Sequence, residues 1–208
     1  MNPMRIELRN RDLKGILGRF MKVLFDTDRA NYPYVQNGYI TPDYACGDEY
    51  LKHMQGKKAD GFAEKVNGVD LGRFTIPQKS LQDATVKLDE ELIAWSGSRN
   101  NAVKMLYPKG GYMGWHTNAN APGYNLLLSW SETGAGYFKY QDLDDGKMVI
   151  AQDNPGWTCK VGYFGNFQEP DKMLWHCANA EHEERVTLGY IIPHEGLWRS
   201  MWEDIQSE

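Results

Sequence analysis

The stretch "GYMGWHTNANAPGYNLLLSWS" (residues 111–131) contains two runs typical of β-strands on either side of a polar turn. The first run is rich in aromatic residues, and the second carries three consecutive leucines. Two asparagines, a proline and a glycine lie between them, and all of these residue types favour turns. The pattern predicts two strands joined by a turn, with His116 and Asn118 at the end of the first strand.

Six further strand-like runs surround this pair. Turn sequences such as "DDGK" and "NPG" separate several of them. Short strands at this spacing predict an antiparallel sandwich or jelly roll, and therefore an α+β, mainly β fold with helices packed on one sheet. The additional runs are "AVKMLY" (102–107), "GYFKYQD" (136–142), "KMVIAQ" (147–152), "WTCKVGYF" (157–164), "KMLWHCA" (172–178) and "RVTLGYII" (185–192).

Alternation along the last run gives its strand two different faces. A bulky apolar face needs a covering layer of helices, so the other face, with Arg185, points into the roll. An unpaired buried charge costs several kcal/mol, and the local sequence fixes no acidic partner for Arg185, so a ligand carboxylate is a candidate partner. The bulky face carries Val186, Leu188, Tyr190 and Ile192, and the opposite face carries Arg185, Thr187, Gly189 and Ile191.

Helical patterns occupy the first hundred residues and the C-terminus. Residues 80–95 form the clearest one, with Ser80 and Asp83 resembling a capping box. Two more helices are expected from Pro42 to Gly56 and in "LWRSMWEDIQ" (197–206). The 80–95 helix should place one stripe against a sheet, made of Leu81, Thr85, Leu88, Leu92 and Trp95.

The composition indicates one soluble domain of 208 residues. We expect helical support and a cleft wall over 1–100, a jelly-roll core over 101–193 and a closing helix over 194–208. Three cysteines without CxxC spacing and the lack of a long apolar run favour a cytoplasmic protein with no membrane segment. The net charge of −5 argues against nucleic acid as a partner. Candidate residues of the cleft wall are Tyr32, Tyr34, Tyr39 and Tyr44.

Two histidines from distant strands could meet at the open end of such a roll. His116 ends one predicted strand and His176 lies in another, and two histidines with a carboxylate form the facial triad of non-haem Fe(II) oxygenases. His182 is a competing candidate, but it lies only three residues before Arg185.

Residues 102–192 resemble the double-stranded β-helix of the Fe(II)- and 2-oxoglutarate-dependent dioxygenases, in particular the prolyl-hydroxylase-like branch. The family pattern is H-x-D, then a distal His, then an Arg or Lys nine or more residues later. Here it reads His116-Thr117-Asn118, His176 and Arg185. The segment "YPKGGYMGWHTN" (107–118) and the run "GAGYFKY" (134–140) also resemble family segments.

The resemblance implies roles for six residues. His116, Asn118 and His176 would bind Fe(II), and Arg185 would bind the distal carboxylate of 2-oxoglutarate. Tyr107 and Thr187 would add hydroxyl groups beside that carboxylate. The implied activity is hydroxylation of an unidentified small-molecule or peptide substrate.

Asn118 departs from the family pattern, because an amide oxygen brings no charge to a metal. Three interpretations stay open. Asn118 is a weak third ligand; or it does not bind, and water, an anion or another carboxylate fills the position, as in halide-inserting relatives; or the site is degenerate and the protein is a binding scaffold. Nearby carboxylates that could substitute are Glu181, Glu183 and Glu184.

Two other functional classes compete with the oxygenase. A non-catalytic or metal-impaired jelly roll would bind a carboxylate or a glycan through Arg185 and aromatic residues. A nucleic-acid demethylase of the AlkB type is disfavoured by the acidic net charge.

Overall fold

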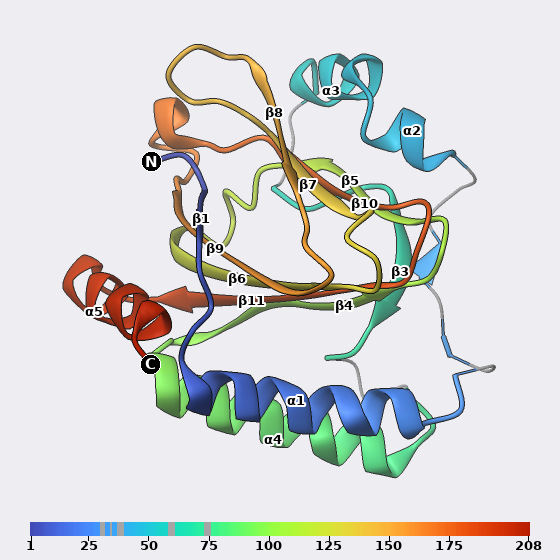
Figure 1. Cartoon of the computed structure of the whole chain (residues 1–208). Helices are drawn as coiled ribbons and strands as arrows, with labels where there is room; N and C mark the ends of the chain where they lie inside the picture. Colours follow the sequence, from blue (N-terminus) through green and yellow to red (C-terminus); the bar gives the residue numbers. More distant parts are fainter. Residues whose placement is uncertain (30–31, 34, 37–39, 58–60, 73–75) are drawn as a thin grey trace.

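The larger of two antiparallel sheets forms one wall of the molecule (Figure 1). The structure is a computed structural model that describes residues 1–29, 32–33, 35–36, 40–57, 61–72 and 76–208. The larger sheet has the strand order β1 (Met4–Ile6), β9 (Gly156–Phe164), β6 (Gly123–Ser131), β11 (Arg185–Ile192) and β4 (Asn100–Tyr107).

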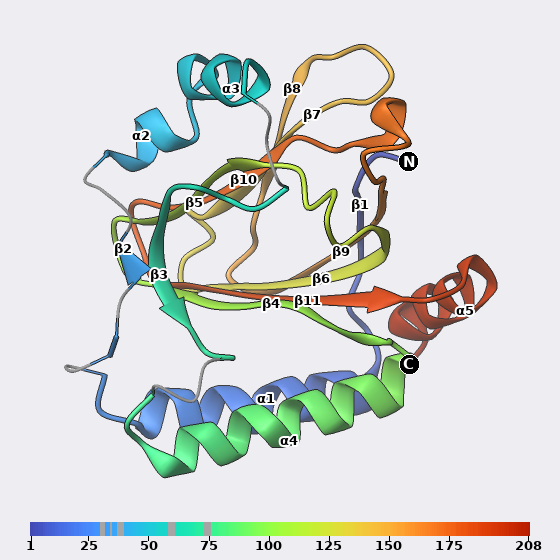
Figure 2. The ribbon, with the colours of Figure 1, turned by 180° about the vertical axis from the view of Figure 1, so that it is seen from behind.

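The smaller sheet faces the larger one (Figure 2). Strand β3 pairs with both β4 and β5, and it therefore joins the two sheets along one side. This arrangement of antiparallel strands is a jelly roll, as the sequence pattern predicted, but helices cover the outer faces of both sheets rather than of one. The smaller sheet has the order β5 (Gly111–His116), β10 (His176–Ala180), β7 (Tyr137–Gln141) and β8 (Met148–Gln152), and the linking strands are β3 (Val66–Asp70) and the short β2 (Val35–Gln36).

Two long helices, α1 (Arg11–Asp26) and α4 (Lys79–Ser96), lie side by side across the outer face of the larger sheet (Figure 2). The bulky face of β11 packs against them in the main hydrophobic core, which confirms the predicted sidedness of that strand. The predicted stripe of α4 is buried except for Trp95, which is half-buried. The core contains Val186, Leu188, Tyr190 and Ile192 of β11, Leu81, Leu88 and Leu92 of α4, and Leu13, Leu17, Phe20 and Leu24 of α1.

The predicted capping box at the start of α4 is wrong. The helix begins at Lys79 with Gln78 at the N-cap, so Ser80 lies inside the first turn, and the Asp83 carboxylate pairs with Lys79 instead. At the other end, Gly97 adopts a left-handed conformation (φ 65°) and its N–H bonds to the Ile93 carbonyl, a helix ending that favours glycine.

The single helix expected from Pro42 to Gly56 is two helices, α2 (Pro42–Ala45) and α3 (Asp48–Gln55). Gly47 between them is extended, and its carbonyl accepts a hydrogen bond from the Trp115 indole at 3.0 Å. The break between α2 and α3 thus coincides with a tertiary contact, and both helices cover the outer face of the smaller sheet around Trp115.

The chain closes with α5 (Glu195–Gln206), which follows β11 as predicted. Strand β10 begins at His176 rather than at Lys172, because Pro170–Lys172 form a short 3-10 helix, η1. No helix among the described residues is long and apolar enough to cross a bilayer.

Candidate functional site

His116 and His176 lie side by side at the mouth of the roll. His116 is the last residue of β5 and His176 the first residue of β10, and the two are partners in the antiparallel register. Their ring centroids are 4.1 Å apart, and each residue is only 4% exposed. The strand pairing therefore brings together two imidazoles that are 60 residues apart in sequence.

Both imidazoles are held through the same ring nitrogen. Nδ1 of His116 lies 2.8 Å from the Gly114 carbonyl, and Nδ1 of His176 lies 2.8 Å from the Leu174 carbonyl. A carbonyl oxygen only accepts, so each Nδ1 carries the proton and each Nε2 retains its lone pair. This is the tautomer in which histidine binds a metal through Nε2.

Burial keeps both imidazoles neutral. It lowers the pKa of His116 to about 4, against a smaller upward effect of the Gly114 carbonyl. Burial, together with the nearby His116, also holds the pKa of His176 well below its ordinary value. Phe138 and Phe164 contribute to that burial, with ring centroids 5.2 and 4.9 Å from the His176 ring.

Asn118 is directed toward this pair by an unusual backbone conformation. Its φ of 56° is left-handed, a region that asparagine tolerates better than most residues, and its N–H bonds to the Gly61 carbonyl at 2.8 Å. The side-chain amide nitrogen lies 3.2 Å from Nε2 of His176. All three residues predicted from the H-x-D and distal-His pattern are therefore neighbours.

A cavity of about 560 Å³ extends from the histidines between the two sheets. Its apolar lining includes Phe138, Ala178 and Leu127, and its charged lining includes Lys104, Lys160 and Arg185. The side chains shared by this cavity and the predicted site are His116, Asn118, His176, Tyr107, Arg185 and Thr187.

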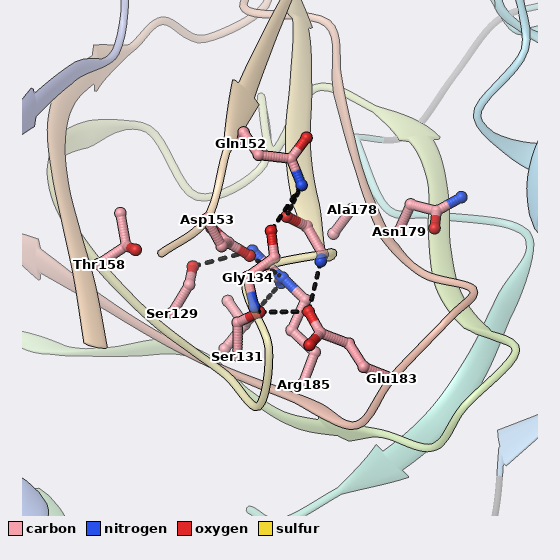
Figure 3. A network of polar contacts seen from close by, with 12 residues as sticks. Ser129, Ser131, Gly134, Gln152, Asp153, Thr158, Ala178, Asn179, Glu183 and Arg185 are labelled. Carbon is pink, nitrogen blue, oxygen red and sulfur yellow. Dashed lines mark hydrogen bonds and ion pairs between the residues drawn. The ribbon is translucent and has the colours of Figure 1, made fainter. Parts of the chain in front are cut away.

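Arg185 has an acidic protein partner that was not predicted. Its Nε donates to Asp153 Oδ2 at 2.6 Å, and Figure 3 shows this contact between side chains from opposite parts of the roll. Lys160 Nζ donates to the other oxygen of the same carboxylate at 2.8 Å, and all three side chains are almost fully buried. The local sequence fixed no acidic partner for Arg185, and the structure supplies one from Asp153, 32 residues earlier in the chain.

In this cluster the single carboxylate of Asp153 forms ion pairs with two cations. Burial raises the pKa of Asp153, but Arg185 and Lys160 outweigh that effect and bring the pKa below its ordinary value. The buried carboxylate of Glu183 also acts on Arg185, so the two cations of this region are balanced by two carboxylates.

Tyr107 and Thr187 flank the guanidinium of Arg185. The Arg185 Nη1 donates to Thr187 Oγ1, and Arg185 Cζ lies 5.9 Å from the centre of the Tyr107 ring. Tyr107 pairs with Arg185 in the register of β4 and β11, and burial raises the pKa of its phenol. Both residues line the cavity, in the positions that the sequence comparison suggested.

The carboxylates expected to replace the missing ligand are bound elsewhere. Glu183 accepts hydrogen bonds from Ser131, from the amide and hydroxyl of Thr133, and from the Gly136 amide (Figure 3). Glu184 pairs with Arg29 at 2.5 Å, and Glu181 lies beside His182. His182 itself is exposed (71% of its side chain) and contributes nothing to the cavity wall.

Four tyrosines were predicted to line the cleft, and the two that the structure describes do not. Tyr32 belongs to the main core and Tyr44 is an exposed neighbour of Tyr50 on the outer surface. Tyr34 and Tyr39 lie outside the described residues.

Three polar residues around Arg185 were missed, namely Lys160, Asp153 and Ser129. The signal for Lys160 was a single charge inside the otherwise apolar run "WTCKVGYF". Asp153 precedes the turn "NPG" and resembled a turn residue, because only the folded chain brings it to Arg185.

The donor atoms near the histidines fit a divalent transition metal in part. Two neutral imidazoles suit iron, zinc, copper or nickel, and an amide oxygen at Asn118 can complete the set without adding charge. Within the residues that the structure describes, no group of three or more His, Cys, Asp and Glu side chains could hold a metal. The site thus offers two strong ligands and one weak one.

Comparison with known proteins identifies similar solved structures but no matching family. No family model matches the chain, and no curated protein matches it. Among solved structures, the chain is similar to a prolyl-4-hydroxylase from Pseudomonas putida, with 12% identity, coverage of 83% of this chain and 98% of that chain, and a TM-score of 0.36. It is also similar to a cupin domain from Bordetella pertussis (19% identity, 44% and 78% coverage, TM-score 0.28) and to a predicted oxalate decarboxylase from Thermotoga maritima (15% identity, 62% and 80% coverage, TM-score 0.28).

Proposed function

We propose that the chain is an Fe(II)- and 2-oxoglutarate-dependent oxygenase. The observation that carries the proposal is the adjacent pair of buried, neutral imidazoles, 4.1 Å apart, in the wall of a cavity that Lys160 and Arg185 also line. Metal-binding and cationic groups within one cavity suit a reaction between a 2-oxo acid and a substrate. The substrate would be a small molecule or a peptide side chain.

His116, His176 and Asn118 would hold the metal. The Gly114 and Leu174 carbonyls fix both rings in the tautomer that leaves Nε2 for a ligand bond. For Asn118, the amide oxygen rather than the nitrogen would have to face the metal, which requires a rotation of the side-chain amide. The chemistry supplied by such a centre is the oxidative decarboxylation of a 2-oxo acid coupled to hydroxylation of a C–H bond.

Other residues would bind the co-substrate and exclude water. Lys160 and Arg185 both line the cavity, and their N–H groups would donate hydrogen bonds to an anionic co-substrate. Phe138 and Phe164 pack against His176 and shield the metal end from solvent.

The direct test is release of succinate from 2-oxoglutarate in the presence of Fe(II) and ascorbate. We expect slow turnover even without the natural substrate, and its loss in His116→Ala and His176→Ala. His182→Ala is a matched control, because His182 is exposed and does not line the cavity. Equal activity in His116→Ala and the wild type would contradict the proposal.

A second candidate function is a non-catalytic jelly roll that binds a carboxylate ligand or a glycan. The observation that favours it is Asn118 in place of a carboxylate, with its amide nitrogen near His176. Such a protein would gain thermal stability with dicarboxylates but not with Fe(II) or Mn(II), whereas the oxygenase should gain stability with both.

A further inference from the structure

We infer that the substrate group that enters the cavity is apolar and uncharged, either an aliphatic chain or an aromatic ring, and that Gly189 provides the space for it. The assignment rests on the proposed function and names the chemical class of its substrate. The side chains on the inner faces of the two sheets indicate this class.

On the inner face of the smaller sheet, an apolar row lies next to the two histidines. Ala178 is two residues after His176 and therefore lies on the same face of β10. The strand register places Met113 of β5 and Phe138 of β7 on either side of Ala178, and Val66 of β3 beside Met113. All four apolar side chains line the cavity, and none of them carries a strong hydrogen-bonding group.

The larger sheet presents a second apolar row, with a glycine at its centre. Gly189 of β11 pairs with Val103 of β4 on one side and with Leu127 of β6 on the other. A Cβ at Gly189 would lie 2.7 Å from Cγ1 of Val103 and 3.3 Å from Cδ2 of Leu127, and both of these side chains line the cavity. A larger residue at this position would therefore displace side chains that form the cavity wall.

The polar groups of β11 lie farther along its inner face. Thr187, two residues before Gly189, pairs with Ser129, and Arg185, two residues earlier still, pairs with Ser131. The inner face thus changes from apolar to polar within five residues of one strand. A polar co-substrate and an apolar substrate group would each find a matching part of this face.

The cavity lining disfavours other classes of substrate. Within the described part of the chain, its charged side chains are those of Asp70, Lys104, Lys160 and Arg185. Three of these four are cations, so a cationic substrate would be repelled. The hydrogen-bonding groups of a sugar or a nucleobase would be buried without partners against the apolar rows, which costs free energy for each group.

NMR of the metal-free protein, with methionine labelled with 13C at the methyl group, tests this class with 1-alkanols as probes. Met105 and Met113 line the cavity, whereas Met54 and Met201 lie buried in other clusters and serve as internal controls. We expect only the Met105 and Met113 signals to shift. The affinity should rise about fourfold per methylene from 1-butanol to 1-hexanol, and glucose and adenosine should shift neither signal.

Gly189→Ala should weaken 1-hexanol binding by about 10-fold, because the new methyl group displaces Val103 or Leu127 into the cavity. The double variant Gly189→Ala/Val103→Ala removes the atom closest to the new methyl group. It should restore most of the affinity.

Met113→Gln provides a second test, should Gly189→Ala not fold. The variant keeps the length of the side chain but places an amide in the apolar row, so 1-hexanol binding, followed at Met105, should weaken by about 10-fold. Met148→Gln is the matched control, because Met148 on β8 is partly buried but does not line the cavity.

Alkanols need no metal to bind, so the substrate class and the proposed function are tested separately. Equal affinities for 1-butanol and 1-hexanol, or unchanged 1-hexanol binding in both Gly189→Ala and Met113→Gln, would overturn the substrate class. In the succinate assay, 1-hexanol should stimulate turnover, and a larger stimulation by glucose or adenosine would also overturn it. A protein that binds 1-hexanol as expected but releases no succinate would instead overturn the proposed function.

Discussion

Among single changes of charge, the loss of the Asp153 carboxylate should destabilise the fold most. In Asp153→Asn the side chain keeps its size, but the carboxylate shared by Arg185 and Lys160 disappears. The new amide group also presents a donor to one of two cations that themselves only donate. The two buried cations then lose their direct ion-pair partner, and the electrostatic effect of Glu183 on Arg185 remains.

The magnitude follows from the burial of this cluster. Removing one partner of a buried ion pair costs about 3–5 kcal/mol, because the remaining charge is left uncompensated. Total stabilities of single domains are about 5–15 kcal/mol, so the variant should lose a large share of its free energy of unfolding. At about 2–4 °C per kcal/mol for a chain of this size, the melting temperature should fall by roughly 6–20 °C.

Urea unfolding followed by circular dichroism measures this loss, with Asp48→Asn as the control. Asp48 pairs with Lys139 at 3.1 Å but is 68% exposed, so its loss should change stability by less than about 1 kcal/mol. The double variant Asp153→Asn/Lys160→Met removes one of the stranded cations and should recover part of the lost stability. Equal unfolding midpoints for Asp153→Asn and Asp48→Asn would refute the reasoning.

Three further predictions concern the histidine end, its pH response and the packing around Arg185. Asn118→Asp should tighten Mn(II) binding by roughly 10- to 100-fold, because it adds a negative charge to the ligand set. The control Asn118→Gly, which the left-handed backbone also accepts, should not tighten binding. Calorimetry measures both affinities, and no gain in the Asp variant would argue against Asn118 as a ligand position. The metal-free protein should lose stability as the pH falls from about 6.5 toward 4, because the unfolded chain binds protons on His116 and His176 that the folded chain does not. The expected loss from His116 is about 1.6 kcal/mol between pH 6.5 and 5, and His176 should add to it; a loss in His116→Gln as large as in the wild type would be inconsistent with this cause. Gly136→Ala should destabilise the fold by about 1–3 kcal/mol, because the new Cβ would lie 2.9 Å from Arg185 Cδ and 3.2 Å from Asp153 Oδ2. Gly18→Ala in α1 is the control: the new methyl group has open space around it, so thermal melts should show a neutral or stabilising effect.

The elements that the sequence pattern predicted well are those with a strong local period. All eight strand-like runs contain strands, and the alternation along β11 correctly separated its core-facing residues from Arg185. The meeting of His116 and His176 also followed from strand pattern and topology, since the two end paired strands of the smaller sheet.

The features that were missed depend on contacts between distant residues. The break between α2 and α3 involves a hydrogen bond from Trp115, and the partner of Arg185 comes from Asp153, which is 32 residues earlier in the chain. Local propensity carries no information on such pairs. The short strands β1, β2 and β3 were missed for the same reason, because their pairing with other strands defines them.

Titration of the metal-free protein with Co(II), followed by visible absorption, tests the metal centre most directly. We predict one ion per chain with ligand-field bands that indicate nitrogen ligation, and loss of those bands in both His116→Ala and His176→Ala but not in His182→Ala. Absence of such bands in the wild type, or bands that persist when both His116 and His176 are replaced, would contradict the proposal that these two imidazoles bind a metal.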